Sequence, residues 1–279
     1  METLQPGDVL LTNDPWFGTG HLNDFTVITP VFKNSRPVAL FAATSHIADV
    51  GGLGFGPDGR QVFEEGLNIP MGYLYRRGEL NEVLMEILRA NVRDPQAAEG
   101  DLHSLTACNQ AGAESLLATM DEFGMDSLDA AADWIISHSR KAMLEQIRKL
   151  PYGTWRNAMR IDGYDEPVDL VCALSIGEDG IDVSFEGTSP VCAHGINVPL
   201  TYTQAYASVG GRCVIGNDGP HNAGSLEVVR VTAPEGTILT APRPAAVSAR
   251  HAIGQMLPDV VLGCLEQPLD GNVPSEGAS

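Results

Sequence analysis

Two strand-like segments joined by a short polar turn constrain the fold of this chain more than any other feature. Asp24 to Phe32 (DFTVITPVF) and Pro37 to Thr44 (PVALFAAT) are rich in β-branched and aromatic residues, and Lys33-Asn-Ser-Arg36 separates them. Such residues favour β-strands, and a four-residue polar connection between two such segments predicts an antiparallel hairpin.

The tetrapeptide H-x-x-D occurs at both open ends of this hairpin. His21-Leu-Asn-Asp24 leads into the first strand, and His46-Ile-Ala-Asp49 follows the second. With the turn centred between the two strands, facing residues have numbers that sum to about 69, so Asp24 lies opposite Ser45 and the two copies meet in space. Residues 51–66 hold six glycines and are predicted to form a loop beside them.

His21, Asp24 and His46 are the candidate metal ligands. Two neutral imidazoles and a carboxylate, with positions left open, suit a divalent metal such as Mn, Fe or Zn. Residues three apart in an extended strand point to opposite faces, so His21 and Asp24 share a metal only if the backbone turns there. Gly18 and Gly20 make such a turn accessible. The spacing leaves two interpretations open, a metal site and a hydrogen-bonded structural cluster.

The period of the apolar residues changes between residues 80 and 150. Helical spacing predicts three helices, over Glu82 to Val92, over Gly100 to Phe123, and from an N-cap at Asp126 or Ser127 onward. Pro151 and Gly153 then end the helical pattern.

Strands return in the last part of the chain. Strands are expected at Trp155 to Ile161, Val168 to Ile176, Ile181 to Phe185, Glu227 to Thr232 and Thr237 to Leu239, with helices at Thr203 to Val209 and Ala245 to Leu265. The predicted fold class is therefore α+β: an N-terminal β-hairpin and metal loop, a central helical segment and a C-terminal mixed α/β sheet region. Residues 1–153 and 154–279 are expected to form two closely packed regions or one continuous domain.

The composition limits the partners of the chain. There are 17 basic and 36 acidic residues, and the resulting charge of −19 disfavours nucleic acid and anionic membrane surfaces. The five cysteines are far apart and odd in number, which indicates neither a disulfide framework nor a zinc knuckle. The start has no leader-like pattern, and no apolar run approaches a membrane span, so a cytoplasmic location is expected.

Two further motifs carry less chemical meaning. Gly54-Phe-Gly-Pro-Asp-Gly59 matches G-x-G-x-x-G, but Pro57 removes an amide donor and no helix is predicted to begin there, so no cofactor-binding residue is predicted. No phosphate-binding loop of the G-x-x-x-x-G-K-[ST] type occurs. Glu64 and Glu65 are interpreted either as a general base and its neighbour facing the metal or as a solvated pair.

Several motifs together resemble the hydantoinase B / 5-oxoprolinase B family, which includes the α subunits of acetone and acetophenone carboxylases. They are PGDVLLTNDP from residue 6, GTGHLND from residue 18, SHIADVGG from residue 45, EEGLNIP from residue 64, NVRDP from residue 91, GDL from residue 100, NVP from residue 197 and APEGTIL from residue 233. The resemblance covers essentially the whole chain.

The resemblance implies roles for individual residues. His21, Asp24 and His46 match the metal ligands of the family. Asn13 and Asp14 lie in the same motifs and are candidates to orient the ligand side chains without binding the metal themselves. Asp49, also within these motifs, and Glu65 are the candidate catalytic residues.

The resemblance also implies a partner and two kinds of reaction. A hydantoinase A-like subunit would bind ATP and activate a small cyclic amide or ketone, which then reacts at the metal of this chain. The expected function is thus the metal-binding subunit of an ATP-dependent amidohydrolase of the hydantoinase or oxoprolinase type. The alternatives are the α subunit of an acetone-type or acetophenone-type carboxylase and a non-catalytic assembly subunit.

The chain departs from the family pattern in two places. Many relatives have a second histidine where this chain has Ile47. Relatives also extend beyond both ends, and their upstream part is expected to supply a further acidic ligand. A fragment, or a chain whose other portions are encoded separately, is therefore expected.

Overall fold

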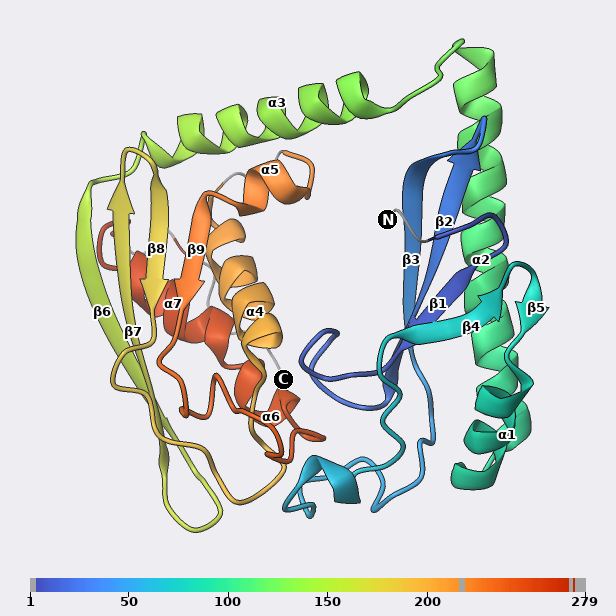
Figure 1. Ribbon diagram of the computed structural model, residues 1–279. Helices are drawn as coiled ribbons and strands as arrows, with labels where there is room; N and C mark the ends of the chain where they lie inside the picture. The colour runs from blue at the N-terminus through green and yellow to red at the C-terminus, as the bar shows by residue number, and fades with distance from the viewer. Residues whose placement is uncertain (1–3, 216–218, 271–272, 274–279) are drawn as a thin grey trace.

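The computed structural model describes residues 4–215, 219–270 and 273 and confirms the α+β class. Two separate sheets lie on opposite sides of the molecule, and helix α3 (Asp129–Ile147) runs between them (Figure 1). The site lies where the N-terminal half, carrying the first sheet, meets a late segment of the C-terminal half.

The first sheet belongs to the N-terminal half and has the strand order β3-β2-β1-β4-β5. Its strands are β1 (Val9–Thr12), β2 (Asp24–Lys33), β3 (Arg36–His46), β4 (Gly72–Arg76) and β5 (Glu79–Leu80). The predicted hairpin is confirmed as β2 and β3, whereas β1, β4 and β5 were not predicted, because they are short and lack a long alternating pattern.

The hairpin register differs by one residue from the prediction. Asn34 and Ser35 form the turn with φ of 50° and 63°, the left-handed pair that suits a two-residue hairpin. A bulge beside Phe32 then shifts the pairing, so that Asp24 faces His46 rather than Ser45. The bulge therefore places two candidate ligands directly across the ladder from each other.

Three helices follow the first sheet, as predicted. They are α1 (Glu82–Asn91), α2 (Pro95–Glu122) and α3. The start predicted for α2 at Gly100 is wrong: the Asp94 side chain accepts a hydrogen bond from the amide of Ala97, and Pro95 occupies the first turn. Helix α2 packs along β2 and β3 and supports the hairpin from one face (Figure 1).

The second sheet has the order β6-β7-β8-β9. Its strands are β6 (Gly153–Ile161), β7 (Val168–Gly177), β8 (Gly180–Ser184) and β9 (Val229–Thr232), and only β8 and β9 pair in parallel. The strands expected at residues 168–176 and 181–185 are confirmed as β7 and β8, which pair as an antiparallel hairpin. Helices α4 (Leu200–Arg212) and α7 (Leu257–Leu265) pack against each other, and α7 also packs on β6 and β7.

Two predictions in the C-terminal half are wrong. The helix expected from Ala245 to Leu265 is reduced to α6 (His251–Gly254) and α7, while α5 (Ala223–Leu226) is a further short helix. The strand expected at Thr237 to Leu239 is a turn with a single bridge to Pro190. Both segments form hydrogen bonds with distant loops instead of regular neighbours, which sequence periodicity does not detect.

Residues 241–251, called here the crossing segment, join the two halves. Each half has its own apolar core, and Val247 is the crossing-segment residue that enters the core of the N-terminal half. Trp16 donates from Nε1 to the Ala241 carbonyl at 2.7 Å, and the Val62 amide donates to Pro244 at 2.9 Å.

The division expected at residue 153 stays a prediction. Helix α3 precedes that boundary, yet its buried apolar residues belong to the core of the C-terminal half. Residues 274–279, the end of the second expected region, lie outside the described residues. Across the ranges that the structure describes, no helix combines the length and the apolar content needed to cross a membrane.

Candidate metal centre

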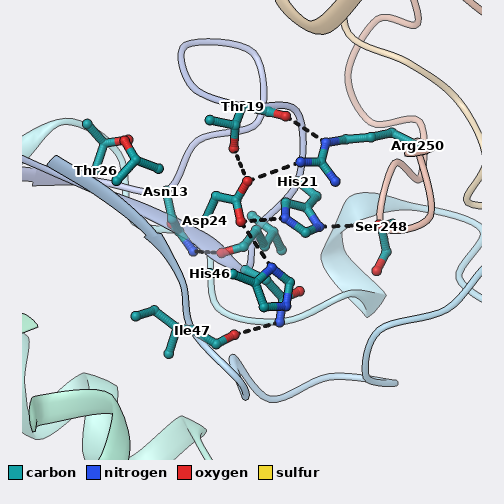
Figure 2. A network of polar contacts seen from close by, with 12 residues as sticks. Asn13, Thr19, His21, Asp24, Thr26, His46, Ile47, Ser248 and Arg250 are labelled. Carbon is teal, nitrogen blue, oxygen red and sulfur yellow. Dashed lines mark hydrogen bonds and ion pairs between the residues drawn. The ribbon is translucent and has the colours of Figure 1, made fainter. Parts of the chain in front are cut away.

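His21, Asp24 and His46 come together at the open end of the hairpin. Each offers one ligand atom, and these three atoms lie within 4.8 Å of one another. Oδ1 of Asp24 lies 2.7 Å from Nε2 of His21 and 3.0 Å from Nδ1 of His46 (Figure 2). Two imidazole nitrogens and a carboxylate oxygen in this arrangement are a donor set for a divalent transition metal.

The backbone before β2 turns in the way that a shared site requires. Residues 15–18 and 22–23 form turns rather than strand, and Gly20 has φ of 95°. A side chain at Gly20 would also meet Arg250, because an added Cβ would lie 2.8 Å from Arg250 Cδ. Glycine at this position therefore lets His21 and Asp24 point the same way despite their spacing.

His21 is held in one orientation from the C-terminal half. Its Nδ1 lies 3.3 Å from the carbonyl oxygen of Ser248, which only accepts hydrogen bonds, so a ring with its Nε2 on a metal would keep its proton on Nδ1 and donate it there. Burial lowers the pKa of His21, against the opposing effect of its hydrogen bond with Asp24. Both ring nitrogens thus have an acceptor within reach, Ser248 at Nδ1 and Asp24 at Nε2, and a cation between Nε2 and Oδ1 would take the place of the proton that bridges them.

Asp24 is fixed through its other oxygen. Oδ2 accepts a hydrogen bond from the Thr19 hydroxyl and pairs with Arg250 Nη2 at 3.0 Å. Burial alone would raise the pKa of Asp24, but hydrogen bonds from His21 and Thr19 and the charge of Arg250 outweigh it and hold this pKa far below its usual range. Asp24 is thus ionised with Oδ1 aimed at both imidazoles, which is the state that binds a metal.

Arg250 connects the crossing segment to this centre. Its Nε donates to the Thr19 carbonyl at 2.6 Å, and its guanidinium lies 4.6 Å above the ring of Tyr202. Burial lowers the pKa of Arg250, but guanidinium stays charged in proteins. Thr19, Ser248 and Arg250 were not predicted from the sequence; a charged residue inside the apolar run from Ala245 to Leu265 was the one local signal.

Asn13 and Asp14 support the loop that carries His21 and do not touch the three ligand side chains. Asn13 donates from Nδ2 to the carbonyls of Leu22, at 2.7 Å, and Leu67, and accepts from the amide of Ile69 at 2.6 Å. Asp14 accepts a hydrogen bond from the Trp16 amide at 3.0 Å and forms an ion pair with Arg243 of the crossing segment.

The two candidate catalytic residues have contacts that favour structural roles. Glu65 is 2% exposed, and its Oε1 accepts from the amides of Val247 and Ser248 at 2.7 Å each, while Oε2 has no hydrogen-bond partner. Burial raises the pKa of Glu65 to about 7. Asp49 accepts from Gly51 and pairs with Arg93. Their catalytic roles stay predictions.

The remaining sequence features lie around this centre. Glu64 is exposed and accepts from the Arg60 amide at 2.6 Å. Ile47, where the family pattern is expected to have a histidine, is buried in the core of the N-terminal half, and the three ligands lie together beside it.

The chain belongs to the hydantoinase B/oxoprolinase family, whose model matches residues 1–279. It is 30% identical over 285 aligned residues to a subunit of a putative D-/L-hydantoinase of Pseudomonas sp. (strain NS671), covering 95% of this chain and 48% of that relative. It is 29% identical to 5-oxoprolinase 1 of Arabidopsis thaliana, covering 94% of this chain and 23% of the relative.

Solved structures show the same fold. The ATP-dependent caprolactamase from Pseudomonas jessenii superposes with a TM-score of 0.90 at 25% identity, covering 96% of this chain and 47% of the other. A nucleotide-free acetone carboxylase superposes with a TM-score of 0.87 at 17% identity, covering 96% of this chain and 38% of the other. The chain thus spans about half the length of the first curated relatives that it matches, and less of the larger ones.

Proposed function

We propose that this chain is the metal-binding part of an ATP-dependent amidohydrolase that opens a cyclic amide after a partner subunit has activated it. The observation that carries the proposal is the His21, Asp24 and His46 centre, in which two imidazole nitrogens and a carboxylate oxygen lie within 4.8 Å of one another. Relatives named as a hydantoinase subunit, a 5-oxoprolinase and a caprolactamase subunit support the reaction class.

The residues of this chain would hold Mn, Fe or Zn and keep its open side accessible. The metal would polarise a carbonyl oxygen or lower the pKa of a coordinated water molecule. With a metal on Nε2, the Ser248 carbonyl would hold the proton of His21 on Nδ1, and Arg250 with Thr19 keeps one oxygen of Asp24 turned toward the imidazoles. His46 has 47% of its side chain exposed and would thus border the side from which substrate arrives.

The partner would be a hydantoinase A-like subunit that binds ATP. Two relatives carry names that describe them as subunits, one of a hydantoinase and the other of a caprolactamase. Because such a partner consumes ATP, we place the complex in the cytoplasm.

The test is ring opening by the chain together with its partner. Hydantoin, 5-oxoproline and caprolactam would be supplied with ATP and Mn²⁺ or Zn²⁺, and ring-opened product would be measured for the wild type and for His46→Ala. ATP-dependent ring opening by the wild type that His46→Ala abolishes is expected. Ring opening that persists in His46→Ala would contradict the role assigned to the metal centre.

A carboxylase is the second candidate, because the acetone carboxylase shares the fold. The same assay with a ketone, in the presence and absence of bicarbonate, separates the two reactions by their products. A carboxylated product that requires bicarbonate would favour the carboxylase. The third candidate, a non-catalytic assembly subunit, predicts a chain that takes up no metal and a partner whose activity survives His46→Ala.

A further inference from the structure

The phenyl ring of Phe55 lies among three imidazoles, two of which belong to the metal centre. Its centroid is 5.4 Å from that of His21 and 5.3 Å from that of His46, both edge-on. On another side it stacks on His251, at 5.1 Å and with the ring planes 11° apart. Yet Phe55 is 51% exposed, so this contact is not part of an apolar core.

The loop that carries Phe55 is packed at its ends and open at its tip. An added Cβ at Gly52 would lie 2.5 Å from the backbone of Glu65, and one at Gly66 would lie 2.5 Å from the Val50 carbonyl. At Gly54, with φ of 88°, an added Cβ would meet nothing within 4 Å, and at Gly56 only an aspartate oxygen at 3.9 Å. The phenyl ring can therefore leave its position without disturbing either core.

His251 has an unmet hydrogen-bonding need beneath this ring. Its Nδ1 is buried and makes no hydrogen bond, and the group stacked on it is a phenyl ring that offers neither a carbonyl nor an N–H. Leaving a buried polar atom unpaired is unfavourable. A planar cyclic amide in place of the phenyl ring would stack on the same face, and its N–H and C=O groups would hold water at the edge of the imidazole, in whose plane Nδ1 bonds.

We propose that Phe55 occupies the place of the substrate ring, and that a five-membered cyclic amide stacks on His251 beside His21 and His46 once Phe55 moves aside. The proposal rests on the proposed function and deepens it. It assigns His251, from the C-terminal half, as a substrate-binding residue and Phe55 as the group that covers the site before substrate arrives.

The test is binding of hydantoin, a planar five-membered cyclic amide, measured by ligand-observed NMR on the purified Zn²⁺-loaded chain. Phe55→Ala is expected to tighten binding roughly three- to tenfold, because the competing ring is gone. The double variant Phe55→Ala with His251→Ala is expected to lose this gain. Phe63→Ala, an exposed phenylalanine of the same loop, and His138→Ala, which stacks on Trp134 in α3, are the matched controls and should leave binding unchanged.

Two outcomes would overturn the proposal. One is a Phe55→Ala variant that binds hydantoin no better than Phe63→Ala. The other is a gain that persists in the double variant, since stacking on His251 would then play no part. Metal content is measured separately on the same samples. A chain that takes up no Zn²⁺ contradicts the proposed function. The NMR measurement of hydantoin binding is then repeated on the metal-free chain and still decides whether the ligand ring takes the position of Phe55.

Discussion

The two halves of the molecule contribute to the metal centre in different ways. The N-terminal half supplies all three candidate ligands from a span of 26 residues, His21 to His46. The crossing segment of the C-terminal half supplies the contacts that orient them, from Ser248 and Arg250. The ligands are therefore a local feature of one hairpin, whereas their orientation depends on contacts across more than 200 residues of chain.

This difference separates two requirements of a metal site. The identity of the ligands determines which ions bind, and the hydrogen bonds that other residues make to the ligand side chains determine how rigidly those side chains are oriented. Variants of the three ligands should therefore remove metal binding outright. Variants in the crossing segment should weaken it and destabilise the contact between the halves.

Asp24→Asn should have the largest effect. It removes the ligand charge and leaves the buried Arg250 guanidinium unpaired, so metal affinity should fall roughly a hundredfold or more and stability by about 3–5 kcal/mol. Isothermal titration with Zn²⁺ and chemical denaturation measure the two effects. Asp14→Asn is the control. Asp14 pairs with Arg243 of the crossing segment and not with a ligand, so this variant should keep metal binding. Equal loss of affinity in both variants would contradict the assignment.

Arg250→Leu should break the contact between the halves without removing a ligand. The Arg250 side chain is 9% exposed, and the Asp24 charge would be left buried without its partner, so a loss of about 3–5 kcal/mol in unfolding free energy is expected. The control is Arg230→Leu, which breaks an ion pair with Asp182 on the exposed side of the second sheet and should cost about 1 kcal/mol or less. Similar losses in both would show that burial of the Arg250 pair is unimportant.

Glu65→Gln should change how stability depends on pH. The pKa of Glu65 is raised to about 7 in the folded chain, so the folded state binds a proton that the unfolded state has already released above pH 4.5. Wild-type stability should therefore fall relative to Glu65→Gln as pH rises from 5 to 8, by on the order of 3 kcal/mol at most. Denaturation at several pH values measures this. Glu64→Gln, at the exposed neighbour, is the control, and parallel curves for wild type and Glu65→Gln would refute the effect.

Thr19→Val should have the smallest effect. It removes one hydrogen bond to Asp24 while the Arg250 pair remains, so metal affinity should fall by about tenfold or less. Thr26→Val, which breaks an exposed hydrogen bond with Thr44 across the same hairpin, should leave affinity unchanged. A Thr19→Val variant as weak as Asp24→Asn would mean that the carboxylate is held mainly by the hydroxyl.

The hairpin and its ligands could be predicted because they are local. Two strand-like runs, a four-residue connection and two copies of H-x-x-D indicated that the ligands meet, and the error of one residue in the register came from a bulge beside Phe32. That shift left the ligand set intact, because Asp24 moved from facing Ser45 to facing His46.

The supporting residues could not be predicted, because apart from the charge of Arg250 inside a largely apolar run nothing local marks them. The apolar periodicity from Ala245 to Leu265 predicts a helix, yet between 245 and 250 the chain forms turns and irregular backbone whose hydrogen bonds go partly to the N-terminal half. Glu65 was interpreted either as a base facing the metal or as one of a solvated pair, and its carboxylate accepts hydrogen bonds from the backbone amides of Val247 and Ser248. Only the tertiary contacts reveal these pairings.

The most direct test of the central claim is the metal content of the purified chain. The wild type, equilibrated with Zn²⁺ or Mn²⁺ and dialysed, should retain one equivalent, and His21→Ala and His46→Ala should each retain almost none while staying folded. His138→Ala, at an exposed histidine of α3, should behave as the wild type. A wild-type chain that retains no metal, or ligand variants that retain a full equivalent, would contradict the claim that these three side chains form a metal centre.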